Sequence, residues 1–275
     1  MDICVLVDNL VQKNVTESSL KPEWGLSVWI SYRGRRILLD GGTSGVFAEN
    51  ARILGIDLGQ ADFAVLSHAH YDHADGLPAF FAENDHAKLY VRSGTGENCY
   101  DCSKEELRYI GIKRGFLEAY ADRIQYVDGD YKLADGIALI PHKTEGLDTI
   151  GKRIGMCVEV DGQMCPECYD HEQSLVFETE KGLVIFNSCS HGGADNIITE
   201  VARTYPNRNI YAVFGGFHLY KSTDEEILAF ANRVKETGIE QIYTGHCTGE
   251  HAAELLKEQL GDIVHQIYTG MRIRL

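Results

Sequence analysis

The chain has 275 residues, of which 44% are hydrophobic and 24% charged, and this composition excludes collagen-like, coiled-coil and disordered proteins. Forty-one acidic residues against 26 basic ones give a net charge of −15, which repels a phosphate backbone. Apolar runs such as 183–186 are too short to span a membrane, and the strand-like run 3–7 is unlike a signal peptide. We therefore expect a cytoplasmic protein that acts on a small molecule and binds neither nucleic acid nor membrane. Its composition is compatible with a homo-oligomer.

Short strands come first in the chain, and strands alternating with amphipathic helices follow. In the first half the hydrophobic pattern predicts strands at 3–8, 25–32, 36–40 and 62–67, and a helix at 46–54. In the second half it predicts a hairpin of strands 173–179 and 182–187, strands at 211–214, 241–244 and 262–268, and helices at 195–204, 224–236 and 249–260. The pattern favours two sheets packed together, with helices outside. The segment around 93–170 is too irregular to assign.

A cluster of metal-ligand residue types follows the predicted strand at 62–67. His68 and His70 are two positions apart, so an extended chain points both side chains the same way. Asp72 and His73 come next, at the turn into a helix. Imidazoles suit Zn, Fe or Mn, and a carboxylate adds charge and hardness. Solvated loop histidines are the alternative, but three histidines and an aspartate within six positions favour a metal site.

The H-x-H-x-D-H pattern at 68–73 resembles the metallo-β-lactamase superfamily. The stretches Leu39-Asp40-Gly41-Gly42 and Val65–Gly76 resemble the first half of that fold. Within the superfamily the chain looks similar to the branch of dihydropterin ribofuranosyl-aminobenzene phosphate synthase-like metallohydrolases. The residues that carry this second resemblance are Val7-Asp8-Asn9, Glu49-Asn50-Ala51, Ser188–Gly193, Gly215–Leu219 and His246–Glu250. The resemblance implies an α/β fold, the αβ/βα four-layer sandwich with two mixed sheets flanked by helices, as a single domain over 1–275.

The resemblance also implies further metal ligands. Family members carry a third His just before a hairpin, an acidic ligand at the end of its second strand, and a last His near the C-terminus. Here His171 precedes the hairpin, although Asp170 or neither residue is an alternative, and His246 is the last His. Where the family has a bridging Asp, this chain offers Cys189 or His191, and the spacing from His171 favours His191. One imidazole nitrogen cannot bridge two metals, so a single occupied site is also consistent with the sequence.

From this resemblance we expect His68, His70 and His171 to hold one metal, and Asp72, His73 and His246 the other, with His191 near both. Zn²⁺ is favoured over Fe or Mn, with one or two ions bound. A metal-activated water is the expected nucleophile.

Side chains that handle the substrate are also expected in the same cleft. Asp72 is expected to orient the attacking water. His218 is expected to bind a substrate anion or protonate the leaving group, and a structural loop histidine is the alternative. The resemblance places Asp8 and Asn9 near the cleft as substrate ligands, although as bare sequence they are equally turn residues.

Eight cysteines in a reducing compartment are expected to be metal ligands, reactive thiols or core residues. Two C-x-x-C pairs, formed by Cys99 and Cys102 and by Cys165 and Cys168, have the spacing of metal knuckles and could close one Cys₄ site for Zn or Fe. A redox dithiol and two unrelated turns are the alternatives. The remaining cysteines, Cys4, Cys157, Cys189 and Cys247, are interpreted as small buried residues.

The function expected from these observations is a metallohydrolase acting on a small, phosphorylated or pterin-type metabolite. An iron-dependent redox protein is one alternative, because related folds bind iron and the chain carries two C-x-x-C pairs. A non-catalytic metal-dependent ligand-binding or sensor protein is the other. The metal content discriminates the first two, and turnover of a generic phosphodiester argues against a pure binder.

Overall fold

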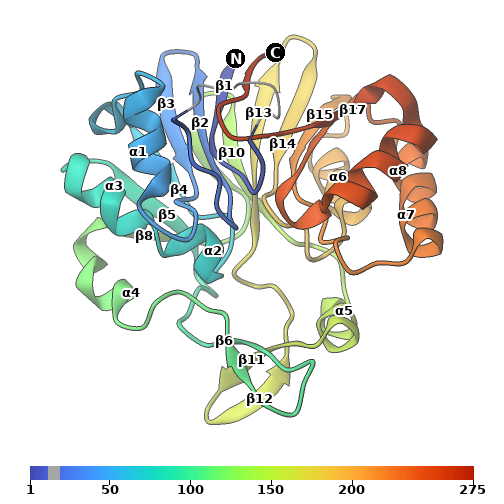
Figure 1. Cartoon of the computed structure of the whole chain (residues 1–275), viewed down its shortest axis with the longest axis horizontal. Coiled ribbons are helices and arrows are strands. Elements are labelled where there is room, and N and C mark those ends of the chain that lie inside the picture. Colours follow the sequence, from blue (N-terminus) through green and yellow to red (C-terminus); the bar gives the residue numbers. More distant parts are fainter. Residues whose placement is uncertain (12–18) are drawn as a thin grey trace. The chain divides into compact units, whose positions relative to one another are not determined.

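A computed structural model describes residues 1–11 and 19–275, which fall into two compact units (Figure 1). Unit 1 comprises Met1–Asp128, Gly146–Glu172 and Tyr268–Leu275, and unit 2 comprises Gly129–Glu145 and Gln173–Ile267. Each unit contains one seven-stranded mixed sheet, as the expected fold class requires. The expectation of a single domain over 1–275 stays a prediction. No helix among the described residues is long and apolar enough to cross a bilayer.

The large sheet of unit 1 combines the two ends of the chain. Its strand order is β18 (Arg272–Arg274), β1 (Asp2–Val7), β2 (Ser27–Tyr32), β3 (Arg35–Leu39), β4 (Phe63–Val65), β5 (Lys88–Arg92) and β8 (Ile124–Val127). The pairs from β18 to β3 are antiparallel and those from β3 to β8 are parallel. The carboxyl ends of β3, β4, β5 and β8 therefore lie along one edge, where the polar residues that follow them can meet.

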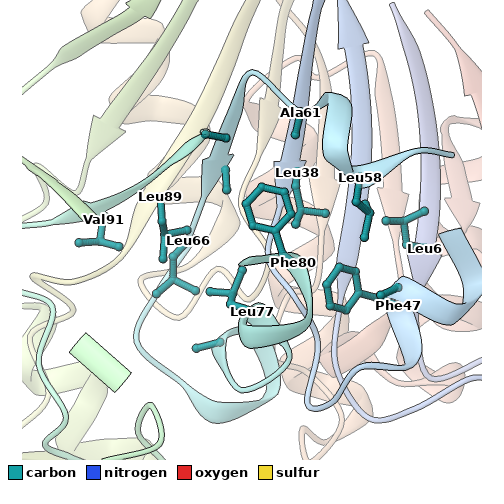
Figure 2. Packing of buried hydrophobic residues seen from close by; sticks show 14 of the residues in the cluster. Leu6, Leu38, Phe47, Leu58, Ala61, Leu66, Leu77, Phe80, Leu89 and Val91 are labelled. Atoms are coloured by element: carbon teal, nitrogen blue, oxygen red, sulfur yellow. The ribbon is translucent and has the colours of Figure 1, made fainter. Parts of the chain in front are cut away.

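Helices α1 (Val46–Ile53) and α3 (Leu77–Glu83) bury their apolar faces in the core of unit 1. Phe47 of α1 and Phe80 of α3 pack with Leu38 of β3 and Leu58 of the short helix η1 (Leu58–Gln60), and all four side chains are buried (Figure 2). Between β4 and α3 runs the four-residue helix α2 (Tyr71–Ala74). This core therefore fixes the two elements, β4 and α2, that flank the predicted metal-ligand cluster.

The rest of unit 1 comes mostly from the segment that the sequence leaves unassigned. It forms a four-stranded antiparallel sheet in the order β12 (Gln163–Pro166), β11 (Met156–Val160), β6 (Cys99–Asp101) and β7 (Arg108–Tyr109). Its helices are α4 (Phe116–Ala119), η2 (Ala121–Arg123) and α5 (Leu147–Ile154). Strand β6 is paired with a strand more than 50 residues further along the chain, so no local pattern reveals this sheet.

The sheet of unit 2 has the order β17 (Val264–Gln266), β16 (Gln241–Thr244), β15 (Ile210–Gly215), β14 (Gly182–Phe186), β13 (Gln173–Thr179), β10 (Ile137–Pro141) and β9 (Tyr131–Ala134). The four strands from β14 to β17 are mutually parallel. The helices are α6 (Ala194–Thr204), α7 (Asp224–Glu236), α8 (Glu250–Leu260), η3 (His246–Thr248) and η4 (Gly261–Ile263). Ile197, Phe230 and Leu256 bury one side of α6, α7 and α8 against this sheet's core.

Most predicted elements are confirmed within one or two residues. Helix α7 has the predicted bounds, because Thr223 accepts a hydrogen bond from the Glu226 amide and Glu226 reciprocates, a capping box. The strand predicted at 262–268 is shorter than expected. Gly261, at a φ of 75°, opens the 3₁₀ turn η4 there, and only Val264–Gln266 remains extended.

A close approach between backbones predicts a large effect at Gly76, the residue before α3. A Cβ added to Gly76 would lie 2.0 Å from the Gly41 carbonyl oxygen and 2.2 Å from that of Ser44. Gly76→Ala should therefore force backbone atoms apart and lower the free energy of unfolding by about 3 kcal/mol. Calorimetry should show a Tm lower by at least about 5 °C.

Gly45→Ala is the matched control. Gly45 also precedes a helix at a negative φ, but its added Cβ would meet only the Ala79 Cβ, at an ordinary 3.6 Å. Any loss of capping is thus common to both variants. Equal Tm values for the two would contradict the steric explanation.

Candidate metal centre

Unit 1 brings the three histidines of the H-x-H-x-D-H motif together at the carboxyl end of β4. The ring centroid of His68 lies 4.7 Å from that of His70 and 4.2 Å from that of His73. All three rings are buried, and Asp72 beside them is buried as well. The predicted cluster is therefore a compact group of side chains, not a set of solvated loop residues.

Asp40 orients this group from the neighbouring strand. It follows β3, has a positive φ of 59°, and is fully buried. Its Oδ1 accepts a hydrogen bond from the Ser67 amide at 2.7 Å. Its Oδ2 accepts one from the Ser67 hydroxyl at 2.7 Å and lies 2.8 Å from Nδ1 of His73. A carboxylate in this position fixes both the tautomer and the orientation of the imidazole.

The same network fixes the tautomer of His68. The single hydrogen of the Ser67 hydroxyl is donated to Asp40, so its oxygen can only accept from Nδ1 of His68, 2.8 Å away. Both His68 and His73 therefore carry a hydrogen on Nδ1 and a lone pair on Nε2. Nε2 of His73 lies 3.9 Å from Oδ2 of Asp72. Two imidazole lone pairs beside a carboxylate form a donor set that suits a divalent ion such as Zn²⁺.

His171 is held differently from its expected role. Its Nδ1 accepts a hydrogen bond from the Ala69 amide at 3.1 Å, so the neutral ring carries its hydrogen on Nε2. That nitrogen lies 3.2 Å from Oε1 of Glu167 and 3.6 Å from Sγ of Cys99. Burial raises the pKa of the Cys99 thiol. Both ring nitrogens are thus engaged within unit 1, and metal binding by His171 stays a prediction that requires one of these contacts to be exchanged.

The four C-x-x-C cysteines have different surroundings. Cys102 forms a disulfide with Cys157, with Cα atoms 6.2 Å apart, whereas the sequence predicts reduced thiols. Cys99 contacts His171, while Cys165 and Cys168 are free thiols. A disulfide-bonded cysteine cannot also ligate a metal. The predicted four-cysteine site therefore requires reduction of the disulfide and stays untested.

Asp8 and Asn9 follow β1 in a hydrogen-bonded turn. Oδ1 of Asp8 accepts from the Leu10 amide at 3.1 Å, and its backbone is paired with the Thr269 hydroxyl. Oδ1 of Asn9 accepts from the Gly25 amide at 3.2 Å. These contacts give both side chains a structural role in unit 1. Their substrate-binding role stays a prediction.

In unit 2, the expected site residues follow three neighbouring parallel strands. His191 comes after β14, His218 after β15 and His246 after β16, so all three lie beyond the same edge of that sheet. The ring centroids of His191 and His218 are 4.8 Å apart. Both His218 and His246 have a positive φ, at 52° and 47°. Non-glycine residues in this conformation are rare and concentrate at functional sites.

Two features of these sites were missed by sequence reasoning. The role of Asp40 depends on contacts to residues 27 and 33 positions away, although its place directly after a strand is a usable signal. Cys189 and Cys247 were interpreted as small buried residues, but together with His246 they form a group of metal-donor atoms that all lie within 4.8 Å of one another. The sequence signal that could have identified these two cysteines is their place close to the expected ligands His191 and His246.

Comparisons with known proteins agree on one family. The model of the metallo-β-lactamase superfamily matches residues 23–150. The chain is 28% identical over 259 residues to the 7,8-dihydropterin-6-methyl-4-(β-D-ribofuranosyl)-aminobenzene-5′-phosphate synthase of Methanocaldococcus jannaschii, covering 87% of this chain and 84% of that enzyme.

Solved structures show the same relationship. The crystal structure of Tm1679, a metal-dependent hydrolase of the β-lactamase superfamily, is 30% identical and has a TM-score of 0.83, covering 100% of this chain and 99% of that one. The Zn²⁺-bound PqqB of Methylobacterium extorquens is 12% identical with a TM-score of 0.59 over the whole of both chains, a likeness of fold alone. The expected α/β fold class is confirmed, and the chain belongs to the metallo-β-lactamase superfamily.

Proposed function

We propose that the protein is a metal-dependent hydrolase of a small, phosphorylated or pterin-type metabolite. The observation that carries this proposal is the Asp40–Ser67 network, which directs the Nε2 lone pairs of both His68 and His73 away from the hydrogen-bonding scaffold. A histidine with a structural role needs no such orientation, whereas a ligand does. The description of Tm1679 as a metal-dependent hydrolase supports the same conclusion.

The residues present fit the metal that the family implies. His68, His70, Asp72 and His73 supply three imidazoles and a carboxylate from unit 1, and His171, His191 and His246 remain the other expected ligands. This nitrogen- and oxygen-rich set accepts Zn²⁺, and also Fe or Mn. A bound divalent ion supplies an acidified water and polarises the bond that is cleaved.

The chain's own residues supply the proton transfers. The Asp72 carboxylate lies beside His73 and is placed to accept a proton from the attacking water and to hold its orientation. Nδ1 of His218 is buried and has no hydrogen-bond partner among the residues that the structure describes, so it is available to protonate a leaving group or bind a substrate anion.

The substrate class rests on the named relative. The Methanocaldococcus enzyme is named for a dihydropterin product that carries a 5′-phosphate. In a chain with a net charge of −15, an anionic substrate needs local positive charge, and a metal ion with mostly neutral imidazole ligands provides it. We therefore expect phosphate esters to be better substrates than neutral esters.

Metal content is the first test of this proposal. Protein purified without added metal or chelator should contain one or two divalent ions per chain, and we expect zinc. His68→Ala removes an oriented Nε2 and should abolish both the bound metal and turnover of bis(p-nitrophenyl) phosphate, while circular dichroism remains unchanged.

His86→Ala is the matched control, because His86 is an exposed histidine of the same unit whose Nδ1 lies 3.2 Å from Oδ1 of Asp85. Full metal content in His68→Ala would refute the assignment. Iron in place of zinc would favour the redox alternative, and bound metal without phosphodiester turnover would favour a sensor.

The second test concerns orientation. Asp40→Asn replaces an acceptor by an amide that cannot accept from both Ser67 and His73, so the histidine tautomers are no longer fixed. We expect metal affinity, measured by competition with a chromophoric chelator, to fall about 10–100-fold. Asp85→Asn, at an exposed carboxylate, should have no effect.

Ser67→Ala provides an independent measurement of the metal affinity, which can be used even when Asp40→Asn folds poorly. It removes only the hydroxyl between Asp40 and His68 and leaves the main-chain hydrogen bond to Asp40 intact. Its affinity should fall as well, with Tm little changed. Unchanged chelator competition in both folded variants would show that the network has no part in metal binding.

A further inference from the structure

The loop that follows β15 carries an exposed aromatic residue beside the expected site residues of unit 2. This residue is Tyr220, whose surface is 41% exposed. Its ring centroid lies 5.3 Å from that of His218, with the two ring planes at 83° in an edge-to-face arrangement. The His218 ring lies in turn 4.8 Å from that of His191. Ring contacts therefore lead from an expected metal ligand to a ring that meets solvent.

Two apolar residues anchor this loop in the core of unit 2. Phe217 and Leu219 are both buried in that core. They alternate along the chain with His218 and Tyr220, whose rings contact each other instead. A single exposed aromatic residue on a protein surface needs no explanation by itself. This one is held by core anchors next to a histidine that the proposed function uses.

The backbone of the loop is held as well. The His218 amide donates a hydrogen bond to Sγ of Cys247 at 3.3 Å, and the Tyr220 amide donates one to the Cys247 carbonyl at 3.2 Å. A Cβ added to Gly249 would lie 3.1 Å from Cβ of Tyr220, and Gly249 has a φ of 80°, so glycine lets the two segments pack closely. An aromatic ring on a fixed backbone binds a ligand at a low cost in conformational entropy.

A cation adjoins the Tyr220 ring. Nζ of Lys221 lies 5.1 Å from the ring centroid, within the range of a cation–π contact. Among the residues that the structure describes, no carboxylate forms an ion pair with Lys221. Asp224, the first acidic residue after it, lies 2.8 Å from Nε2 of His251 instead. The ammonium group is therefore available to an anionic ligand.

We propose that Tyr220 and Lys221 determine substrate specificity, Tyr220 by stacking on a flat heteroaromatic ring and Lys221 by binding an anionic group attached to that ring system. The inference rests on the proposed function, because it specifies how the same site recognises its substrate. A ring placed against Tyr220 lies beside His218, whose buried Nδ1 is assigned there to the leaving group or a substrate anion. In a chain with a net charge of −15, an anionic ligand depends on local cations of this kind.

Binding of three small probes tests the proposal without any need for turnover. Pterin-6-carboxylate has both the flat ring and the anion, pterin has the ring alone, and cyclohexanecarboxylate has the anion without an aromatic ring. Full-length, metal-containing protein is titrated, with fluorescence polarisation for the two pterins and competition for the third probe. Pterin-6-carboxylate should bind at least about tenfold more tightly than cyclohexanecarboxylate, because only the pterin stacks. Equal affinities in the wild-type protein would overturn the proposal, whether or not any variant folds.

Two pairs of variants separate the ring from the charge. Tyr220→Leu should weaken the binding of both pterins about tenfold or more, and Tyr220→Phe, which keeps the ring, should retain it. Lys221→Gln should weaken pterin-6-carboxylate about three- to fivefold and leave pterin unchanged, and Lys221→Arg should retain both affinities. All affinities are compared at equal metal content. Unchanged binding in Tyr220→Leu, or an equal loss for both pterins in Lys221→Gln, contradicts the assignment.

The same unit offers a matched pair of control residues. Nζ of Lys181 lies 5.0 Å from the ring centroid of Tyr211, so this pair has the same kind of contact. Tyr211 lies near the start of β15, whereas Tyr220 comes after its end. Tyr211→Leu and Lys181→Gln should leave all three affinities unchanged. A loss in these variants as large as that in Tyr220→Leu and Lys221→Gln would show a general effect of ring or charge removal and overturn the proposal.

Turnover of bis(p-nitrophenyl) phosphate distinguishes this inference from the proposed function. Turnover in a protein that binds neither pterin overturns the inference and leaves the metallohydrolase proposal standing. Pterin binding with the expected pattern among the variants, but without turnover, supports ring recognition and refutes hydrolysis of the phosphodiester.

Discussion

The buried carboxylate of Asp40 is the constraint on which the candidate centre of unit 1 depends. A buried charge is tolerated only when it is hydrogen-bonded, and here the partners are the amide and hydroxyl of Ser67 and the imidazole of His73. Main-chain hydrogen bonds also join the loop after β3 to the histidine motif. The Gly41 amide donates to the His73 carbonyl, and the Gly76 amide donates to the Gly42 carbonyl. The loop after β3 thereby fixes the motif that follows β4. The histidines are positioned by the fold itself before any ion is considered.

The expected site residues of unit 2 are positioned in a different way. Parallel strands β14, β15 and β16 deliver three loops to one edge, and left-handed backbone conformations turn the side chains there. Position is fixed by backbone geometry and sulfur contact. In unit 1 it is fixed by hydrogen bonding to a charge.

Sequence reasoning succeeds where structure depends on local pattern. Helix α7 is predicted with its exact bounds because its cap residue Thr223 and the acidic residues of its first turn, among them Glu226, stand together in the sequence. The small sheet of unit 1 is not predicted, because β7 has two residues and β6 pairs with a strand far along the chain. The motif histidines likewise follow from spacing. Their partners do not, since Asp40 and His73 are 33 residues apart and meet only through the tertiary fold.

The two units differ in the donor atoms that they offer to a metal ion. Unit 1 offers imidazoles and the carboxylate of Asp72, a set that accepts Zn²⁺, Fe²⁺ and Mn²⁺ with little discrimination by ligand type. Unit 2 adds two sulfurs at a contact distance of 3.5 Å. Thiolates bind Mn²⁺ poorly, whereas they hold zinc at about 2.3 Å. The histidine motif that identifies the family therefore leaves the choice of metal open.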